Sequence, residues 1–167
     1  MSRRTTVINS LINSIAETTG ASGYRGMRFL HEVNSFPAFY VHAGAESRVH
    51  ISDGVRYGLI EVSIRGYQWS DSLDSIETFA RDIESAVDSF YTSNRELVEE
   101  ARVTSLSTDE GTLSPYGAVD LSVTVLYIAY DGNNQPVKSI NYEMLDNDGN
   151  ALLSPAGDVL SIPAEFK

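Results

Sequence analysis

The sequence predicts an α+β protein in which an antiparallel β-sheet carries two helices packed on one face, followed by a C-terminal β-hairpin appendage. Three observations predict this fold. Two stretches place apolar residues at helical spacing, four others are rich in β-branched and aromatic residues, and the last part of the chain holds two strong turn signals. The length of 167 residues suits one domain of ordinary size.

The first element is predicted to be a helix. Apolar residues within Val7–Ala16 recur in pairs every four positions, which makes one apolar stripe. Thr5 or Thr6 is the expected N-cap, and Gly20 is expected to end the helix. Residues 20–36 have no clean period, so we expect a long loop with at most a short strand or turn.

Two strands are predicted next. Ala38–Ala43 is rich in residues that favour a pleated, buried surface, and Val55–Trp69 alternates apolar with polar residues. The polar stretch Gly44–Asp53 between them is expected to be a long hairpin loop. The two strands are therefore predicted to pair antiparallel.

A second helix is predicted over Leu73–Tyr91, where apolar residues fall at spacings of three and four. Asp71 or Ser72 is the expected N-cap. The predicted outer face is strongly acidic and comprises Asp74, Glu77, Asp82, Glu84 and Asp88. A solvated or partner-facing surface explains these carboxylates better than a catalytic pair does, because the opposite face of the helix is apolar.

The sheet is predicted to continue with Ala101–Leu106 and Val119–Ile128, joined by a loop over Ser107–Tyr116. Beyond residue 130 the turn signals at 131–134 and 147–150 predict a hairpin, with Val137–Leu145 pairing with Ala151–Leu153. We therefore assign residues 1–130 to an α+β core and residues 131–167 to a C-terminal β extension. The extension is either part of the same domain or an arm that reaches a neighbouring subunit.

Composition excludes several classes of protein. The chain has no cysteine, which rules out a disulfide scaffold, a thiolate zinc site and a cysteine nucleophile. It has no apolar run of the roughly 20 residues that a membrane helix needs. The first residues lack an apolar signal core, so we expect a cytoplasmic protein.

Charge is distributed unevenly along the chain. The formal net charge is −11; residues 1–66 hold seven bases and five acids, whereas residues 67–167 hold five bases and eighteen acids. This balance argues against general nucleic-acid binding, which needs lysine and arginine against phosphate. The basic residues of the first part are better suited to contact an acidic neighbouring subunit; they are Arg3, Arg4, Arg25, Arg28 and Arg48.

The sequence shows no catalytic, cofactor-binding or metal-binding motif. His42 and His50, with Glu46 or Asp53, are the one conceivable metal set, but their spacing matches no compact ligand motif, so we interpret the histidines as surface or interface residues. The acidic run at residues 146–150 lacks the glycine and glutamate positions of a calcium loop. Nucleophile-elbow and phosphate-binding loop sequences are also missing. These features favour a binding or assembly protein over an enzyme.

One segment carries a resemblance to a known family. Residues 103–127 read VTSLSTDEGTLSPYGAVDLSVTVLY, and the S-T-D-E-G-x-L-x-P-Y-G loop at Ser107–Gly117 resembles that of tail terminator, or tail completion, proteins of long-tailed siphophages, most of all the T5-like type. The element order over residues 5–128 is also similar, including FPAFYVHAG at residues 36–44. Residues beyond about 130 depart from the family pattern.

The resemblance implies a structural role without catalysis or cofactor. Proteins of this family form a six-membered ring on the head-proximal end of the tail tube, where the ring stops tube polymerisation and provides the surface for head joining. The implied partners are further copies of the chain, the major tail tube protein and a head-completion or connector protein. DNA would pass through the ring lumen without specific binding, no membrane is involved, and the protein would assemble in the host cytoplasm and reside in the virion tail.

A subunit or partner interface is predicted at this loop, because its glycine and proline residues fix a shape while Asp109 and Glu110 place two charges at its tip. The predicted interface residues are Ser107, Thr108, Asp109, Glu110, Gly111, Leu113, Pro115, Tyr116 and Gly117, with Arg25 and Arg28. A hairpin connection kept only for its turn geometry is the alternative explanation of the loop.

Other functions remain open at this point. A head–tail connector or another minor tail protein of similar fold is the nearest alternative. A small soluble enzyme with a site at His42, His50 and Asp53, or a bacterial binding module, is more distant.

Overall fold

The computed structural model describes residues 2–26, 33–50, 56–69, 72–109 and 115–129, together with the strand segments 142–143 and 161–162. The helices and strands, in chain order, are α1 (Arg3–Thr19), β1 (Ser22–Arg25), β2 (Ala38–His50), β3 (Arg56–Trp69), α2 (Leu73–Ser93), β4 (Val98–Asp109), β5 (Tyr116–Ile128), β6 (Tyr142–Glu143) and β7 (Ser161–Ile162).

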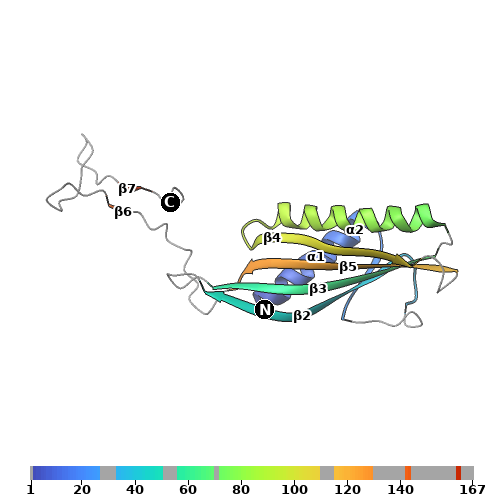
Figure 1. Ribbon diagram of the computed structural model, residues 1–167, viewed down its shortest axis with the longest axis horizontal. Coiled ribbons are helices and arrows are strands. Elements are labelled where there is room, and N and C mark those ends of the chain that lie inside the picture. The colour runs from blue at the N-terminus through green and yellow to red at the C-terminus, as the bar shows by residue number, and fades with distance from the viewer. Residues whose placement is uncertain are drawn as a thin grey trace. The chain divides into compact units, whose positions relative to one another are not determined.

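The first five strands form one sheet in the order β1-β2-β3-β5-β4 (Figure 1). The pairs β2–β3, β3–β5 and β4–β5 are antiparallel, whereas β1 lies parallel to β2. The predicted α+β class is therefore confirmed, and the sheet is mixed because the chain after α1 adds β1 alongside β2.

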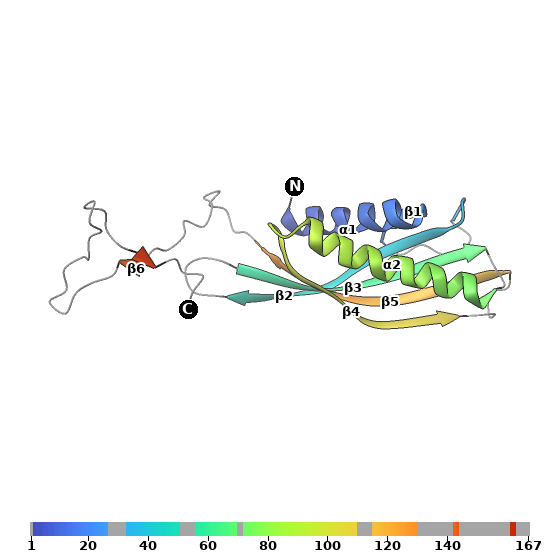
Figure 2. The ribbon, with the colours of Figure 1, turned by 90° about the horizontal axis from the view of Figure 1, so that it is seen from above.

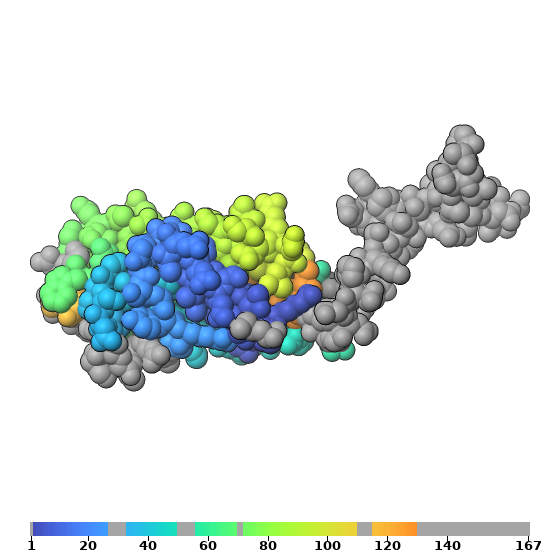
Figure 3. Space-filling model, turned by 180° about the vertical axis from the view of Figure 1, so that it is seen from behind, coloured from blue at the N-terminus to red at the C-terminus, as the bar shows by residue number. Residues whose placement is uncertain are grey.

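Both helices cover the same face of this sheet (Figures 1 and 2). In β3, Ile60, Val62 and Ile64 are buried between exposed or half-buried neighbours, as expected of a strand with one covered face. They share a hydrophobic core with apolar residues of α1 and α2, such as Leu11 and Phe90. Figure 3 shows the outer surface of this helical layer, with α1 in blue beside α2 in green to yellow.

Two glycines allow α2 to pack closely on the sheet. A Cβ atom at Gly66 would lie 2.7 Å from Cε1 of Phe79, and a Cβ atom at Gly117 would collide with Ile76. Phe79 and Ile76 are buried residues of α2. The absence of a side chain at these positions of β3 and β5 therefore sets how near the helix comes.

The ends of the helices differ in part from the prediction. Ser2, and not Thr5 or Thr6, is the N-cap of α1, where its side chain accepts a 3.2 Å hydrogen bond from the backbone N–H of Thr5. Gly20 ends α1 with φ of 67°, a left-handed conformation that glycine adopts without strain. Ser72 is the N-cap of α2, as predicted.

Three strands are longer than predicted, and a further strand lies in a stretch that was predicted to be mainly loop. β2 runs on through residues 44–50, which the prediction placed in a loop, and it contains a bulge between Ala43 and Glu46. β1 lies inside the stretch that was predicted to be mainly loop. β4 extends to Asp109, and β5 begins at Tyr116. Pairing with a neighbouring strand satisfies the backbone of these polar segments, which overrides their weak local strand signal.

The chain divides into two compact units, residues 1–131 and residues 132–167. In the second unit Tyr142 pairs with Ile162 and Glu143 with Ser161, so β6 and β7 are antiparallel. Residues 142–143 lie within the predicted strand Val137–Leu145. The predicted return strand Ala151–Leu153 and the two turn signals lie outside the described residues, and the function of the extension stays a prediction.

Candidate interaction surfaces

The predicted interface loop begins and ends in paired strands. Ser107, Thr108 and Asp109 are the last residues of β4 and pair with Asp120, Val119 and Ala118 of β5. The prediction that they lie in a loop is therefore wrong, because the antiparallel ladder between β4 and β5 continues to Ala118. The unpaired connection is correspondingly shorter.

The other residues of the predicted loop lie within or just after residues 110–114, which are outside the described ranges. Pro115 is an exposed turn residue, Tyr116 and Gly117 begin β5, and Glu110, Gly111 and Leu113 lie outside the described residues. Gly117 is buried, and its contact with Ile76 explains why this position lacks a side chain. Its place in the motif thus reflects packing of α2 on the sheet.

Tyr116 belongs to a cluster of aromatic rings at one end of the sheet. Its ring centroid lies 4.8 Å from that of Trp69 and 4.9 Å from that of Phe36. Trp69, which pairs with Tyr116 across β3 and β5, is 61% exposed. An aromatic side chain with that exposure next to the predicted interface loop is available for contact with another protein.

Arg25 is not brought together with this loop. It is an exposed residue at the end of β1, opposite Val41 of β2. Because β1 and β4 are the two edges of the sheet, Arg25 and Asp109 lie on opposite sides of the core unit. Arg28 lies outside the described residues.

The edge of the sheet next to α1 carries a group of charged side chains. Glu46 forms two ion pairs: its Oε1 lies 3.0 Å from the guanidinium of Arg48, and its Oε2 lies 3.6 Å from Nε of Arg4. Arg4 also donates a 2.7 Å hydrogen bond to the carbonyl of Gly44. We call Arg4, Glu46 and Arg48 the basic corner, because the half-buried Arg4 and the exposed Arg48 flank one carboxylate that is only 9% exposed.

The basic corner is tied to the core by Tyr127 of β5. Its hydroxyl donates a 2.8 Å hydrogen bond to Oε1 of Glu46. Burial and this hydrogen bond to the carboxylate raise the pKa of Tyr127 to about 12. The glutamate is thus held by three partners and has a structural role in positioning the two arginines.

The opposite side of the helical layer is acidic. Ser14 of α1 donates a 2.9 Å hydrogen bond to the carbonyl of Ala86 in α2, so Ala86 marks the side of α2 that faces α1. Glu77, Glu84 and Asp88 are spaced about half a turn around the helix from Ala86, and we call them the acidic flank. Glu77 pairs with Arg81 at 3.9 Å, whereas Glu84 and Asp88 have no ion pair with any residue that the structure describes.

A known protein family matches this chain. The family model described as bacteriophage tail tube terminator protein matches residues 1–135. The chain belongs to this family. A curated relative, the tail tube terminator protein p142 of Escherichia phage T5, is 30% identical over 109 residues, which is 58% of this chain and 68% of the relative. A chain of the virion of a native gene transfer agent particle has a TM-score of 0.46 at 10% identity, covering 72% of this chain and 91% of that chain.

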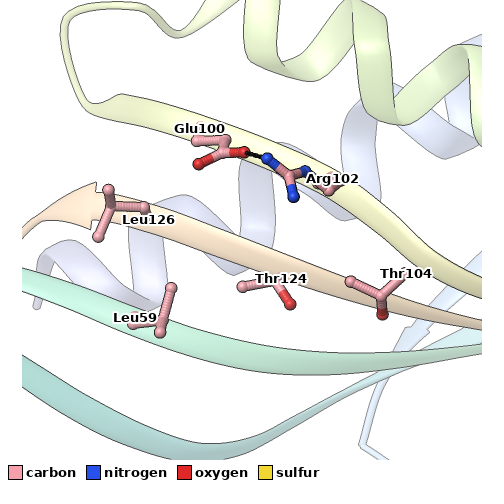
Figure 4. Close-up of a pocket in the computed structure, with 6 residues that line it drawn as sticks. All are labelled: Leu59, Glu100, Arg102, Thr104, Thr124 and Leu126. Carbon is pink, nitrogen blue, oxygen red and sulfur yellow. Dashed lines mark hydrogen bonds and ion pairs between the residues drawn. The ribbon is translucent and has the colours of Figure 1, made fainter.

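Membership of the tail tube terminator family makes the chain a structural phage tail protein and not an enzyme. A hollow on the open face of the sheet is lined by side chains of β3, β4 and β5 (Figure 4). An ion pair between Arg102 and Glu100 borders the hollow. Its lining residues are Leu59, Glu100, Arg102, Thr104, Thr124 and Leu126.

Of the conceivable metal set from the sequence, the structure describes the side chains of Glu46 and His42 but not that of His50. Glu46 is engaged by Arg4, Arg48 and Tyr127, and His42 is exposed on β2 opposite Ser63. Asp53 lies outside the described residues. The described ranges contain no group of three histidine, aspartate or glutamate side chains able to hold a metal ion, and no described helix is long and apolar enough to cross a membrane.

Sequence reasoning missed the basic corner as a unit. Arg4 and Arg48 were predicted to contact an acidic neighbour, but Glu46 was placed in a loop and Tyr127 fell within the predicted strand Val119–Ile128. Simple alternation along a longer strand would have put Glu46 on the face opposite to Val41 and Ala43. The bulge between Ala43 and Glu46 turns the glutamate to the helix-covered face, opposite Ile60, and no sequence pattern signals this bulge.

Proposed function

We propose that this chain forms a closed ring that caps the head-proximal end of the tail tube, stops tube polymerisation and provides the surface for head joining. The observation that carries the proposal is the match of residues 1–135 to the tail tube terminator family. The fold supports it, because the core unit has two different lateral surfaces, the basic corner and the acidic flank. A closed ring needs such a pair of unlike surfaces, since each copy meets the next head to tail.

The charge distribution suits this contact. The basic corner lies on β2 and α1, the acidic flank lies on α2 over β4 and β5, and β3 separates β2 from β5 and β4 in the strand order. Oppositely charged lateral surfaces favour one orientation and register between copies. We infer six copies per ring from the family resemblance, with the major tail tube protein below and a head-completion or connector protein above.

The loop between β4 and β5 is proposed as a contact to a neighbouring copy or to the tube. Asp109 and Glu110 carry its charge, and Tyr116 extends the contact to the exposed ring of Trp69. Arg25 and Arg28 are proposed to contact an acidic neighbour on the other edge of the sheet. Reversal of charge in the double variant Asp109→Lys, Glu110→Lys is expected to reduce incorporation into tails at unchanged thermal stability; full incorporation would remove the loop from the interface.

An early stop codon in the gene tests the proposed function. Lysates are viewed by negative-stain electron microscopy, with a plasmid copy of the intact gene as the control. Headless tails of excessive, variable length support a terminator that halts polymerisation. Headless tails of normal length assign the protein to head joining alone, as for a connector, and normal virions overturn both functions. A mass measurement of the isolated ring would decide the number of copies.

A further inference from the structure

Part of the outer edge of β2 is uncovered in the core unit. β1 pairs with Ala38–Val41, and the last described main-chain hydrogen bond on that side runs from the N–H of Gly26 to the carbonyl of Val41 at 2.9 Å. The side chain of Arg4 donates to the carbonyls of Ala43 and Gly44 beyond it. No described strand lies outside residues 46–50. The outer edge of β4 is likewise without a strand partner among the described residues. Unpaired edges of this kind are templates for another strand.

The two uncovered edges lie at the same height of the sheet. The register joins Arg48 to Gly58, Gly58 to Tyr127 and Tyr127 to Val98, in one row across β2, β3, β5 and β4. A parallel row joins Glu46 to Ala101 through Ile60 and Val125. The open segment of β2 is therefore level with the first residues of β4.

The strand directions at these edges are compatible with pairing. Three successive antiparallel pairs, β2–β3, β3–β5 and β5–β4, make β2 and β4 run in opposite directions. Rotation about an axis that runs along the strands changes neither the height nor the direction of a strand. In a flat ring with such an axis, β4 of one copy would meet β2 of the next antiparallel and level with it.

The charges of the helical layer match at this height. The guanidinium of Arg3 donates a 3.3 Å hydrogen bond to the carbonyl of Ile128, and the N–H of Ile128 donates to the carbonyl of Leu97 at 2.9 Å. The N-terminus of α1 and the chain that leaves α2 therefore lie at the same end of the sheet. That end holds the basic corner on one edge and, on the other, the C-terminal half of α2 with Glu84 and Asp88.

We propose that neighbouring copies join edge to edge, with Val98–Ala101 of β4 pairing antiparallel with Glu46–His50 of β2 in the next copy. The acidic flank above β4 then faces the basic corner of that copy, whose two arginines exceed its one glutamate in charge. Main-chain hydrogen bonds supply the contact, and the charges select its partner. This contact rests on the proposed ring.

Thiol cross-linking tests the contact, because the chain has no cysteine and every thiol is an introduced one. Ser47 and Glu100 are exposed and lie in one register row through Leu59 and Leu126, so the variant Ser47→Cys, Glu100→Cys places two thiols level across the proposed joint. The matched control is Ser47→Cys, Ser107→Cys, since Ser107 is exposed on the same strand but about 23 Å further along at roughly 3.3 Å per residue. A short bis-maleimide joins the first pair and cannot span the second.

The experiment uses the full chain, both purified at increasing concentration and in tails assembled from the plasmid-borne variant. A ladder of covalent multimers from the first variant, roughly tenfold above the control because the reagent does not reach the extra height, supports the contact. The additional change Asp88→Lys should reduce the ladder, whereas Asp74→Lys at the other end of α2 should not.

The two proposals fail differently. Equal cross-linking in both cysteine variants, or none in solution and in tails alike, overturns the edge-to-edge contact while the tail phenotype of the stop codon still decides the function. Conversely, normal virions without the gene overturn the function, and the ladder from the purified chain still decides whether two copies join at these edges.

Discussion

The hydroxyl of Tyr127 and the carboxylate of Glu46 lie 2.8 Å apart although 81 positions of chain separate the two residues. Tyr127 belongs to β5 and Glu46 to β2, so the tyrosine side chain reaches across β3. It does so over Gly58, where an added Cβ would lie 2.5 Å from Cε1 of Tyr127 and 2.6 Å from Oε1 of Glu46. The missing side chain of Gly58 leaves room for the tyrosine ring, and the ion pair between Arg4 and Glu46 links the same carboxylate to α1.

Replacement of Tyr127 by phenylalanine is expected to lower the free energy of unfolding by about 1 kcal/mol, because one hydrogen bond is lost while Glu46 keeps both arginines. Denaturant unfolding followed by circular dichroism at neutral pH measures the change. Tyr116→Phe is the control, because the described contacts of that side chain are made by its ring, and its change should stay within about 0.5 kcal/mol. Equal losses in the two variants would contradict the prediction.

Gly58→Ala is expected to destabilise the protein more than Tyr127→Phe does. The new methyl group forces Tyr127 and Glu46 apart, and overpacking of this kind costs about 1–3 kcal/mol. The double variant Gly58→Ala, Tyr127→Phe does not relieve the clash with the ring, so the loss should persist. Ser122→Ala on the exposed face of β5 serves as the control for substitution in the sheet. An unchanged free energy of unfolding in Gly58→Ala would mean that the ring of Tyr127 can move aside without loss of stability.

Alkaline pH is expected to weaken the fold through Tyr127. Its pKa in the folded protein is raised to about 12 from the ordinary value of 10.0, so the protonated phenol contributes its full stability below pH 10. The contribution is lost as the pH rises from 10 through 12. Unfolding free energies of the wild type and of Tyr127→Phe should therefore converge over this range. Tyr57 and Tyr67, whose pKa values burial also raises, remain in both proteins and cancel in the difference.

A smaller side chain at position 79 is expected to offset part of the stability that a larger side chain at Gly66 removes. Gly66→Ala alone should cost about 1–3 kcal/mol, since its Cβ would meet Cε1 of Phe79 at 2.7 Å. Combined with Phe79→Leu, which removes that part of the ring, the cost should be less than the sum of the two single changes. A double-mutant cycle in denaturant measures the difference, and strict additivity would show that α2 moves as a whole.

Trp69 is expected to contribute little to the stability of the isolated chain. It is 61% exposed, so Trp69→Ala should change the free energy of unfolding by less than about 1 kcal/mol. Phe90→Ala, at a fully buried position of α2, should cost about 3–5 kcal/mol. Loss of tail incorporation in the tryptophan variant at unchanged stability would indicate that the ring is covered by a partner.

The elements that sequence alone predicted well are those with a strong internal period. In α2 the spacing of Ile76, Phe79, Ile83 and Phe90 marks the buried face, and the structure buries all four. In β3 the alternation around Val62 does the same for a strand. Such patterns are set locally, because each buried position repeats at the period of its own element.

The elements that were missed depend on distant partners. Residues 44–50 continue β2 only because Ser47 and Arg48 find Leu59 and Gly58 on β3. β1 is short and contains a glycine, and it is a strand because it pairs parallel with β2. Polar residues in an edge strand look like a loop when the neighbouring strand is not known.

The sequence predicted the sign of the charge on the candidate surfaces but not which charged side chains lie together. Summed charge showed a basic first part and an acidic second part of the chain, but only the structure shows which of these charges lie together, in the basic corner and in the acidic flank. Arg4 and Arg48 come together through their ion pairs with Glu46, and the pair between Arg4 of α1 and Glu46 of β2 is a long-range contact that no local pattern contains.

The short length of β1 has a consequence for assembly. A strand that pairs with a uniform edge can shift by two residues and still point each side chain to the same face of the sheet. A uniform edge therefore fixes the pairing register poorly. The edge of β2 is not uniform, because β1 ends beside Val41 and forms a step. A strand that slides along β2 toward Val41 would collide with the end of β1 and could move no further. In the proposed edge-to-edge contact, the end of β1 would therefore limit how far β4 of the next copy can shift along β2.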